Sequence, residues 1–159
     1  MKELHKIAVL LGANLGNEEE IFDFASQKLS AGGVRDIVRS SIYITSPVDC
    51  VANTPDFHNQ ALTGYWQGTP QELLALTQAI EISAGRPAQH SSREARKLDC
   101  DIILFDNETV EEKNLQIPHP RAKARSFVLE PLAEIAGTWT FPDGESVAEA
   151  AQKLKNQSV

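Results

Sequence analysis

The chain alternates strand-sized apolar runs with helical segments that carry their own start and stop signals. The longest obvious apolar run, residues 7–11, suits one strand and is far too short to cross a bilayer. Residues 18–30 have an apolar stripe at helical spacing, with Asn17 as a cap and a pair of glycines as the stop. Thr69-Pro70-Gln71-Glu72 is a capping box with proline at the first helical position, so a second helix should run from there to Gly85.

The order of these segments predicts the fold. Strands are expected at residues 7–11, within 36–45, at 58–67 and at 98–105, with one helix after the first strand and one after the third. This β-α-β-β-α-β order is typical of the ferredoxin-like α/β sandwich, an α+β fold whose mainly antiparallel sheet has the two main helices packed on one face. A helical stretch at residues 121–135, interrupted near Pro131, and a C-terminal helix opened by the capping box at residues 146–149 are additions to it. With no convincing linker, we expect one domain over residues 1–159.

Charge and cysteine content narrow the possible functions. The formal net charge of −7 disfavours general binding of nucleic acid, and no segment has the pattern of a membrane span or a signal peptide. Two cysteines, Cys50 and Cys100, do not make a disulfide framework, so we expect a cytoplasmic protein, and no obligate protein partner is evident. Eight of the fifteen Lys and Arg residues nevertheless fall between Arg86 and Arg125. This basic region is either a solvated face or a pocket for a compact polyanion such as a nucleoside triphosphate.

Two carboxylates open the apolar run at residues 98–105. Asp99 and Asp101 should project from one face of the strand, roughly 7 Å apart at their Cα atoms, because side chains alternate between faces. Cys100 between them should face the opposite side as a small core residue. The two acids either accept hydrogen bonds from backbone or arginine groups, or bind Mg²⁺, which prefers oxygen ligands. Their spacing alone does not distinguish these roles.

Residues around this pair suit phosphate chemistry. The loop at residues 86–97 is rich in arginine, and its guanidinium groups either face solvent or share the charge of a bound phosphate with metal ions. His119 stands between two prolines that restrict the backbone, so its ring could donate a hydrogen bond to a phosphate or cap the following helix.

Another group of residues suits a planar heterocycle. Phe57 and Asn59 should share a face at the start of the third strand, where asparagine offers both donor and acceptor atoms and phenylalanine offers a stacking surface. Core packing is the alternative role for the phenylalanine. The loop at residues 12–16 lacks the spacing of a classical phosphate loop and is better suited to form a backbone wall beside a small flat ligand. Glu81, on the second helix, is by itself an ordinary surface charge.

Taken together and in order, several segments resemble the 6-hydroxymethyl-7,8-dihydropterin pyrophosphokinase family. The resemblance covers roughly residues 6–145 and is carried by LLGANLGN, SSIYITSPV, PDFHNQAL, IEISAGR, ARKLDCDIILFDNE, LQIPHPRAKARSFVLEPLAEIA and FPDG. It implies the fold predicted above. It also implies transfer of the terminal diphosphate of ATP to the hydroxymethyl group of the pterin, with release of AMP, in folate biosynthesis.

The resemblance implies roles for individual residues. Asp99 and Asp101 match the aspartates that hold two Mg²⁺ ions around the ATP phosphates, and with Arg86 and Arg96 they make up the expected catalytic set. The expected ATP contacts are Arg86, Arg96, Ile102, His119, Arg125 and Glu81. The expected pterin contacts are Thr45, Val48, Phe57, Asn59 and Phe127, with two aromatic rings sandwiching the heterocycle.

The loop at residues 86–97 departs from the family pattern. Ala88 stands where a second arginine is common, and the run from Arg93 to Arg96 stands where Trp-Gly-Pro-Arg is common, so the aromatic ring that would cover the pterin is missing. Ser46 stands where a proline is common. These departures leave room for a non-catalytic or altered-substrate paralogue that binds a pterin or a nucleotide through a remodelled lid loop. A metal-dependent nucleotidyltransferase, which would release pyrophosphate, is a third possibility.

Overall fold

Most predicted segments form the strands and helices expected of them, with boundaries shifted by a residue or two, but the region 36–45, where one strand was predicted, holds two short strands. The computed structural model describes residues 3–13, 18–45, 57–85 and 98–157. The strands are β1 (His5–Ala13), β2 (Arg35–Arg39), β3 (Tyr43–Thr45), β4 (Phe57–Trp66), β5 (Asp99–Phe105), β6 (Val110–Glu112) and β7 (Leu115–Ile117). The helices are α1 (Glu18–Ala31), α2 (Pro70–Gly85), α3 (Ser126–Ala136) and α4 (Val147–Gln157), with a 3-10 turn η1 (Ala122–Ala124) before α3.

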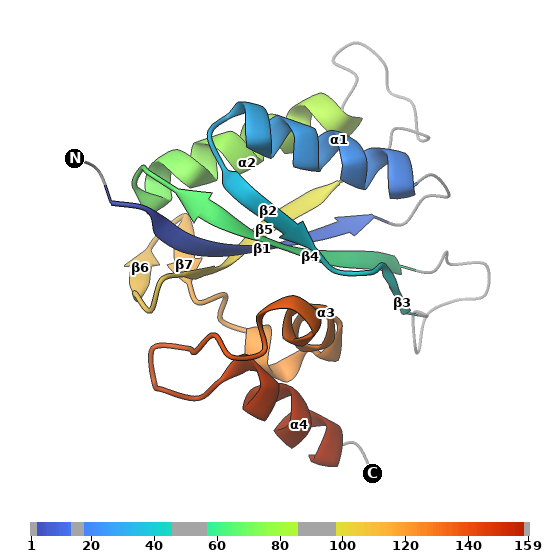
Figure 1. The fold of residues 1–159 in the computed structure, drawn as a ribbon, viewed down its shortest axis with the longest axis vertical. Helices are drawn as coiled ribbons and strands as arrows, with labels where there is room; N and C mark the ends of the chain where they lie inside the picture. The colour runs from blue at the N-terminus through green and yellow to red at the C-terminus, as the bar shows by residue number, and fades with distance from the viewer. Residues whose placement is uncertain (1–2, 14–17, 46–56, 86–97, 158–159) are drawn as a thin grey trace.

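The main sheet has the strand order β2-β4-β1-β5, and β3 also pairs with β4 (Figure 1). All neighbouring strands run antiparallel. The chain crosses from β1 to β2 through α1, and from β4 to β5 through α2, so each crossover passes over one intervening strand. This split arrangement is that of the ferredoxin-like sandwich, which confirms the predicted fold class.

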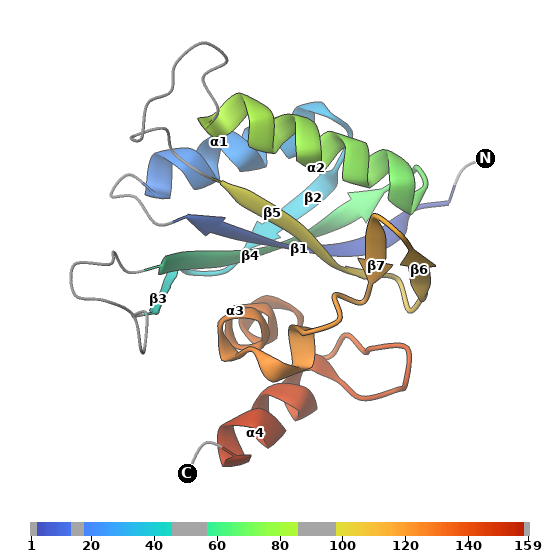
Figure 2. The same cartoon turned by 180° about the vertical axis from the view of Figure 1, so that it is seen from behind.

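Helices cover both faces of the sheet (Figures 1 and 2). One core lies under α1 and α2 and includes Ile7, Leu11, Phe22 and Leu73. A second core lies between the sheet and the pair α3 and α4, and includes Leu10, Ala61, Val128, Leu132 and Val147. Burying one such side chain stabilises the fold by about 1.5–3 kcal/mol. The first layer was predicted, whereas the placement of α3 and α4 on the other face was not.

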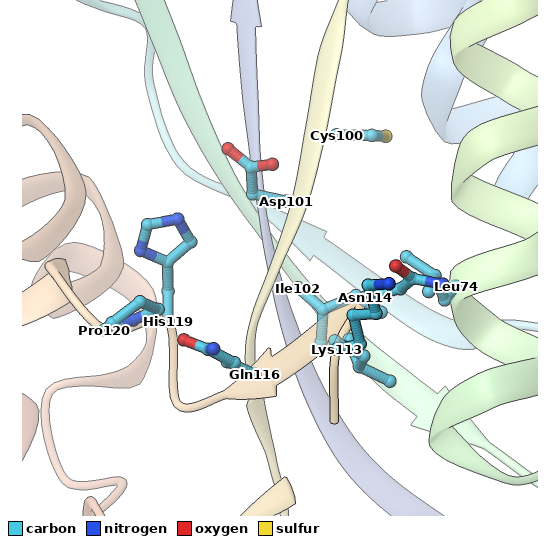
Figure 3. A pocket seen from close by; sticks show the side chains of 10 residues that line it. Leu74, Cys100, Asp101, Ile102, Lys113, Asn114, Gln116, His119 and Pro120 are labelled. Carbon is cyan, nitrogen blue, oxygen red and sulfur yellow. The ribbon is translucent and has the colours of Figure 1, made fainter. Parts of the chain in front are cut away.

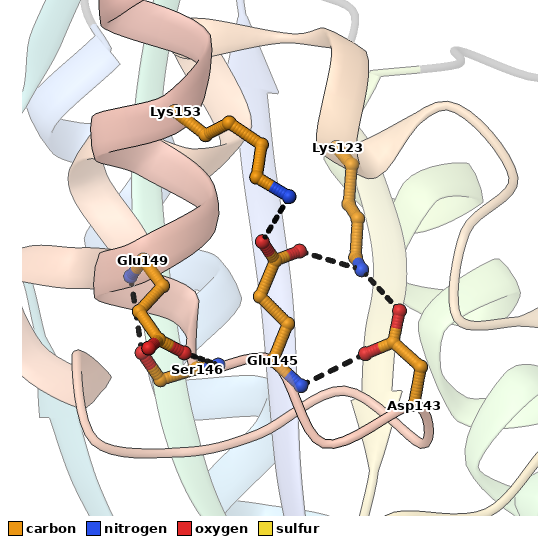
Figure 4. A network of polar contacts seen from close by, with 6 residues as sticks. All are labelled: Lys123, Asp143, Glu145, Ser146, Glu149 and Lys153. Carbon is orange, nitrogen blue, oxygen red and sulfur yellow. Dashed lines mark hydrogen bonds and ion pairs between the residues drawn. The ribbon is translucent and has the colours of Figure 1, made fainter.

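Both predicted capping boxes are present. At the start of α2, the Thr69 hydroxyl accepts a hydrogen bond from the Glu72 N–H at 3.0 Å, and the Glu72 carboxylate accepts one from the Thr69 N–H at 2.9 Å. Ser146 and Glu149 repeat this exchange at the start of α4, at 3.0 and 2.9 Å (Figure 4). Each cap satisfies two backbone donors that a helix start otherwise leaves unpaired.

An ion-pair network joins η1 to the segment before α4 (Figure 4). Glu145 accepts hydrogen bonds from the ammonium groups of Lys123 and Lys153, at 2.7 and 2.9 Å, and Lys123 also pairs with Asp143. The Lys123 hydrogen bond is the main reason that the pKa of Glu145 lies below its usual value. The network therefore ties η1 to α4 and to the segment that precedes α4.

One detail of the helical prediction was wrong. The break in the stretch at residues 121–135 falls at Arg125, whose extended backbone (φ −124°, ψ 110°) separates η1 from α3. Pro131 lies inside α3 and is buried in the second core. Pro131 is the sixth of the eleven residues of α3, so it removes one intrahelical hydrogen bond. Burial of its ring offsets part of that loss. No helix in the described part of the chain is long and apolar enough to span a membrane.

Candidate active site

β5 places the two predicted acids on the face of the sheet that α3 covers. Asp101 lies opposite Leu10 of the second core, and Asp99 lies opposite Gly12. Cys100 is 4% exposed and packs in the first core. In Figure 3 the side chains of Cys100 and Asp101 leave the strand on opposite sides. The predicted alternation is confirmed, and two carboxylates of one face stand at the start of an otherwise apolar strand.

The electrostatic environment of Asp101 favours a cation. Burial is the first cause that raises the pKa of this carboxyl, and the negative charge of Asp99 raises it further. His119 and Arg125 act in the opposite direction and lower it. The two acids therefore repel each other across a partly desolvated space. A divalent cation between them would relieve the repulsion, and carboxylate oxygens are the ligands that Mg²⁺ prefers.

His119 projects from the segment after β7 on the same side of β5 as Asp101 (Figure 3). Its Nδ1 accepts a hydrogen bond from the Arg121 N–H at 3.2 Å. Burial lowers the pKa of the imidazole, Asp101 opposes this effect, and Arg125 and Arg121 lower the pKa further. A neutral ring whose Nδ1 is an acceptor carries its proton on Nε2. One nitrogen of His119 thus braces the following turn, whereas its predicted hydrogen bond to a phosphate stays a prediction.

A pocket of about 310 Å³ runs from these residues to an apolar end (Figure 3). Asp101 and His119 stand at its polar side, and Leu74 of α2, Ile102 of β5 and Leu115 of β7 supply apolar wall. Gln116 and Asn114 add amide groups. A volume of this size lies at the lower end of the range for small-molecule sites. The pocket suits a ligand with a flat apolar part and an anionic part directed at His119, with a cation between that anion and Asp101.

Asn59 is the most unusual polar residue of the sheet. It is 0% exposed, and neither its amide oxygen nor its amide nitrogen has a hydrogen-bond partner among the described residues. Buried amides are nearly always paired, because leaving one unpaired costs about 1–3 kcal/mol. Gly12 makes room for this arrangement: a Cβ there would stand 2.8 Å from the Phe57 ring and 3.4 Å from the Asn59 amide oxygen. An unpaired amide held beside an aromatic ring indicates a site for a flat polar ligand.

Two further predicted pterin contacts lie on β3 and α3, which both pack against β4, the strand of Asn59. Thr45 pairs with Phe57 in the β3–β4 ladder, and its hydroxyl donates to the Phe57 carbonyl at 3.3 Å. Phe127 opens α3 and is half-buried against the second core, with the Arg125 guanidinium 5.4 Å from the centre of its ring. Phe57 and Phe127 therefore reach the same face of the sheet from a strand and from a helix.

Strand register connects the two halves of the site. Asn59 pairs with Gly12, and Gly12 pairs with Asp99. Residues directly opposite each other in an antiparallel sheet project to the same face, so Asn59 and Asp99 lie in one row, two strand spacings or about 10 Å apart. The acids and the amide thus project from the same face of the sheet, the face on which α3 packs.

Glu81 contacts the aspartate strand from the other layer. Its carboxylate accepts a hydrogen bond from the Cys100 N–H at 2.8 Å, at the outer edge of β5 and between the two acids. Burial is the first cause that raises the pKa of Glu81, the Cys100 hydrogen bond lowers it, and Asp101 and Asp99 raise it further. The structure places Glu81 against the backbone that carries the acids, whereas its predicted contact with ATP stays a prediction.

Some predicted residues lie outside the described part of the chain. These are Arg86, Arg96 and Val48, together with Ala88, Arg93 and Ser46, where the sequence departs from the family pattern. Sequence reasoning in turn missed the residues of the β6–β7 hairpin and Leu74 that line the pocket. Nothing in the sequence pattern placed these residues beside Asp101.

The fold and the site define a class: a ferredoxin-like α+β protein with two neighbouring acids and a buried amide on one face of its sheet and a pocket of about 310 Å³ beside the acid-bearing strand. The amide has no hydrogen-bond partner among the described residues. Comparison with known proteins is more specific. The family model described as 7,8-dihydro-6-hydroxymethylpterin-pyrophosphokinase (HPPK) matches residues 8–137. The chain belongs to this family.

Individual relatives agree with this assignment. The 2-amino-4-hydroxy-6-hydroxymethyldihydropteridine pyrophosphokinase of Bacillus subtilis is 39% identical over 132 residues, which are 80% of this chain and 75% of the relative. The protein of the same name from Pseudomonas aeruginosa is 33% identical over 147 residues, 92% of this chain and 90% of the relative. Other relatives are much longer: the folic acid synthesis protein fol1 of Pneumocystis carinii is 31% identical over 96% of this chain, which spans only 20% of that protein.

Solved structures support the fold. The wild-type HPPK-DHPS of Plasmodium falciparum superposes with a TM-score of 0.74 at 14% identity, over 99% of this chain and 47% of that one. At this identity the likeness concerns the fold alone. It agrees with the ferredoxin-like arrangement of the HPPK domains.

Proposed function

We propose that this chain transfers the diphosphate of ATP to the hydroxymethyl group of 6-hydroxymethyl-7,8-dihydropterin and releases AMP, a step of folate biosynthesis. Family membership supports the reaction type. The observation that carries the proposal for this chain is the single row that joins Asp99 to the unpaired, buried Asn59. In this proposal, the two acids bind the metal ions of the ATP phosphates and the amide hydrogen-bonds to the heterocycle. Both groups then face one space, at a separation that a transferred diphosphate can bridge.

Mg²⁺ ions, two in number, would be held by Asp99 and Asp101. The fit rests on the chemistry of the donor set: two hard oxygen ligands on one face, one of them with its pKa raised by burial and by the other. Bound Mg²⁺ neutralises phosphate charge and polarises the oxygens around the phosphorus under attack. Glu81, which holds the Cys100 N–H between the acids, keeps the local backbone in place for that task.

ATP would enter the pocket beside β5 with its base toward Ile102, Leu74 and Leu115 and its phosphates toward Asp101. The Nε2–H of His119 is a neutral donor for a phosphate oxygen, and Arg125 adds positive charge that acts on both His119 and Asp101. Arg86 and Arg96 are proposed as further phosphate contacts from the loop at residues 86–97. Guanidinium groups match phosphate oxygens in pairs, which suits this use.

The pterin would lie between Phe57 and Phe127, with Asn59 reading its edge. The amide oxygen accepts from a ring N–H, and the amide nitrogen donates to a ring acceptor, so binding supplies both partners that Asn59 lacks. Thr45 and Val48 are proposed to border the ring from β3 and the following loop. Stacking between two aromatic rings adds affinity and fixes the plane of the heterocycle that carries the hydroxymethyl arm.

The reaction then depends on alignment. The hydroxymethyl oxygen attacks the β-phosphorus of ATP, the bond from that phosphorus to the oxygen bridging to the α-phosphate breaks, and AMP leaves with the bridging oxygen. The hydroxyl proton is lost to solvent or buffer. The chain contributes by holding the alcohol in line on the Asn59 side and the triphosphate on the β5 side, since phosphoryl-type transfer draws mainly on positioning and on neutralised charge.

The product distinguishes the candidates. Purified chain mixed with ATP, Mg²⁺ and hydroxymethyldihydropterin should produce AMP and the pterin diphosphate in equal amounts. Robust ADP formation with the pterin would rule out the proposed reaction, and release of pyrophosphate would indicate a nucleotidyltransferase. Ligand binding without turnover would indicate the non-catalytic paralogue, which the family comparisons do not favour.

The domain organisation, the partners and the localisation of the chain remain predictions. We propose that residues 1–159 form one catalytic domain, that it acts on these two small molecules without nucleic acid, membrane or obligate protein partner, and that it is cytoplasmic. Several relatives carry this region inside longer chains named as bifunctional folate synthesis proteins. Separate purification of this chain with full activity would test the proposal of an independent domain.

A further inference from the structure

One carboxylate of α3 holds the connection between β2 and β3. The Ser41 N–H donates to the Glu134 carboxylate at 3.1 Å, and the hydroxyl groups of Ser41 and Tyr43 donate to it at 2.8 Å each. The Ser41 hydrogen bond is the main cause that lowers the pKa of Glu134, so the ionised acceptor is favoured. We call Glu134, Ser41 and Tyr43 the Glu134 clamp.

The clamped segment is fixed on its other side by the sheet. Ser40 is 4% exposed, and its hydroxyl accepts a hydrogen bond from the Ala61 N–H of β4 at 2.9 Å. The Gln60 amide donates to the Ser40 carbonyl at 2.8 Å. Consecutive residues are thus held by β4 and by α3, so the chain enters β3 in one defined position relative to both.

The clamp joins two elements that hold proposed pterin contacts. β3 carries Thr45, two residues after Tyr43, and α3 carries Phe127, seven residues or two helical turns before Glu134. Residues two apart in a strand, and residues seven apart in a helix, lie on the same side of their element. Tyr43 also pairs directly with Asn59. The spacing between Thr45 and Phe127 therefore depends on the contact between Glu134 and the β3 segment.

We infer that Glu134 is a positioning residue that sets the width of the pterin pocket by tying β3 to α3. The inference rests on the proposed function, because it assigns Thr45 and Phe127 to that pocket. Asp99, Asp101 and His119 belong to β5 and to the segment after β7, on the far side of β1. Loss of the clamp should thus weaken pterin binding while the ATP side keeps its geometry.

The experiment compares Glu134→Ala, Glu134→Gln and Tyr43→Phe with wild type. Glu130→Ala is the charge control, because Glu130 is an exposed glutamate one turn earlier on the same helix and its negative charge acts on Tyr43, as that of Glu134 does. Steady-state AMP formation gives KM for the pterin and for ATP separately, and hydrogen exchange reports the amides of residues 41–45 without any need for turnover.

The inference expects Glu134→Ala to raise the pterin KM about tenfold, with the ATP KM within twofold of wild type and faster exchange at residues 41–45. Tyr43→Phe, which loses one of the three hydrogen bonds, should give a smaller change of the same kind. Glu134→Gln should give changes in KM and in exchange between those of Glu134→Ala and Tyr43→Phe. Glu130→Ala should match wild type. Each charge-assisted hydrogen bond to a carboxylate is stronger than a neutral one, which explains this order.

Two results would overturn the inference. One is an unchanged pterin KM and unchanged exchange in Glu134→Ala. The other is an equal rise in both KM values, which would indicate a general loss of structure. A wild-type chain that forms no AMP would refute the proposed function instead. In that case, faster exchange at residues 41–45 in Glu134→Ala than in Glu130→Ala would still support the Glu134 clamp. Equal exchange in the two variants would refute the clamp.

Discussion

Neighbouring buried amides on β4 allow one prediction to be tested against its own control. Asn59 is buried with no partner for either amide atom among the described residues, whereas Gln60 is buried with both ends paired. The Gln60 oxygen accepts from Arg39 Nε at 3.0 Å, and its nitrogen donates to the Ser40 carbonyl at 2.8 Å. Replacing each by an apolar residue of similar size, Asn59→Leu and Gln60→Met, should therefore change stability in opposite directions.

The magnitudes follow from the cost of an unpaired buried amide. Relieving that cost in Asn59→Leu should raise the free energy of unfolding of the ligand-free protein by about 1–2 kcal/mol, and with it Tm by about 2–8 °C. Gln60→Met leaves an arginine N–H and a carbonyl unpaired, so it should lower the free energy of unfolding by about 1–3 kcal/mol. Pterin binding should be weakened in Asn59→Leu, because the polar edge of the pterin ring loses its hydrogen-bond partners. We expect kcat/KM for the pterin to fall roughly 30- to 700-fold, or about 2–4 kcal/mol.

Thermal unfolding without ligands, and AMP formation at varied pterin concentration, measure both effects. The reasoning would be refuted by an Asn59→Leu protein that is less stable than wild type and yet keeps its pterin KM. Such a protein would have an Asn59 amide that is already paired in the free state and does not read the ligand. A rise in stability combined with a loss of pterin affinity is the pattern expected where a polar group is kept for binding at the expense of the fold.

Three further predictions concern the β5 side of the site. Replacing Asp101 by Asn should lower kcat/KM by about 100- to 1,000-fold at saturating Mg²⁺, as expected when a group that stabilises transferred charge is lost, and unchanged AMP formation would contradict the metal assignment. Burial lowers the pKa of His119, so the unfolded chain binds a proton there that the folded chain does not. Stability should then be present above the unfolded pKa of about 6.5 and fall as pH drops through it, and the decrease in Tm between pH 7.5 and 5.5 should be smaller in His119→Asn than in wild type. Glu81→Ala removes the acceptor of the Cys100 N–H and should lower the free energy of unfolding by about 1–2 kcal/mol. Glu81→Gln keeps an acceptor oxygen and should lose less stability. Equal losses in the two variants would show that the hydrogen bond is not the cause.

Much of the fold could be predicted from short stretches of sequence. The capping boxes at Thr69 and Ser146, the glycine stop after α1 and the apolar strand at β5 each depend on interactions within a few residues, so their patterns predict local structure directly. The same holds for the opposite faces of Asp101 and Cys100, because strand alternation needs no tertiary information. The resemblance of several ordered segments to one family predicted the reaction class before any contact was known.

Tertiary structure decided which distant residues meet. The row from Asn59 through Gly12 to Asp99 depends on the register of three strands, and a shift of one residue would have turned one of these side chains to the other core. The position of α3 over that row, and the break at Arg125 in place of Pro131, depend on how the second core packs.

The sequence by itself therefore determined the elements, their order and the residue types available for phosphate and heterocycle chemistry. Packing decided that Asn59 is buried with no hydrogen-bond partner among the described residues, that Glu81 holds the backbone between the acids and that Glu134 ties β3 to α3. The physical reason is the separation along the chain of the residues that interact. Helix caps and strand alternation are set by neighbours along the chain, whereas Tyr43 and Glu134 are 91 residues apart and meet only because a sheet and two layers of helices bring them together.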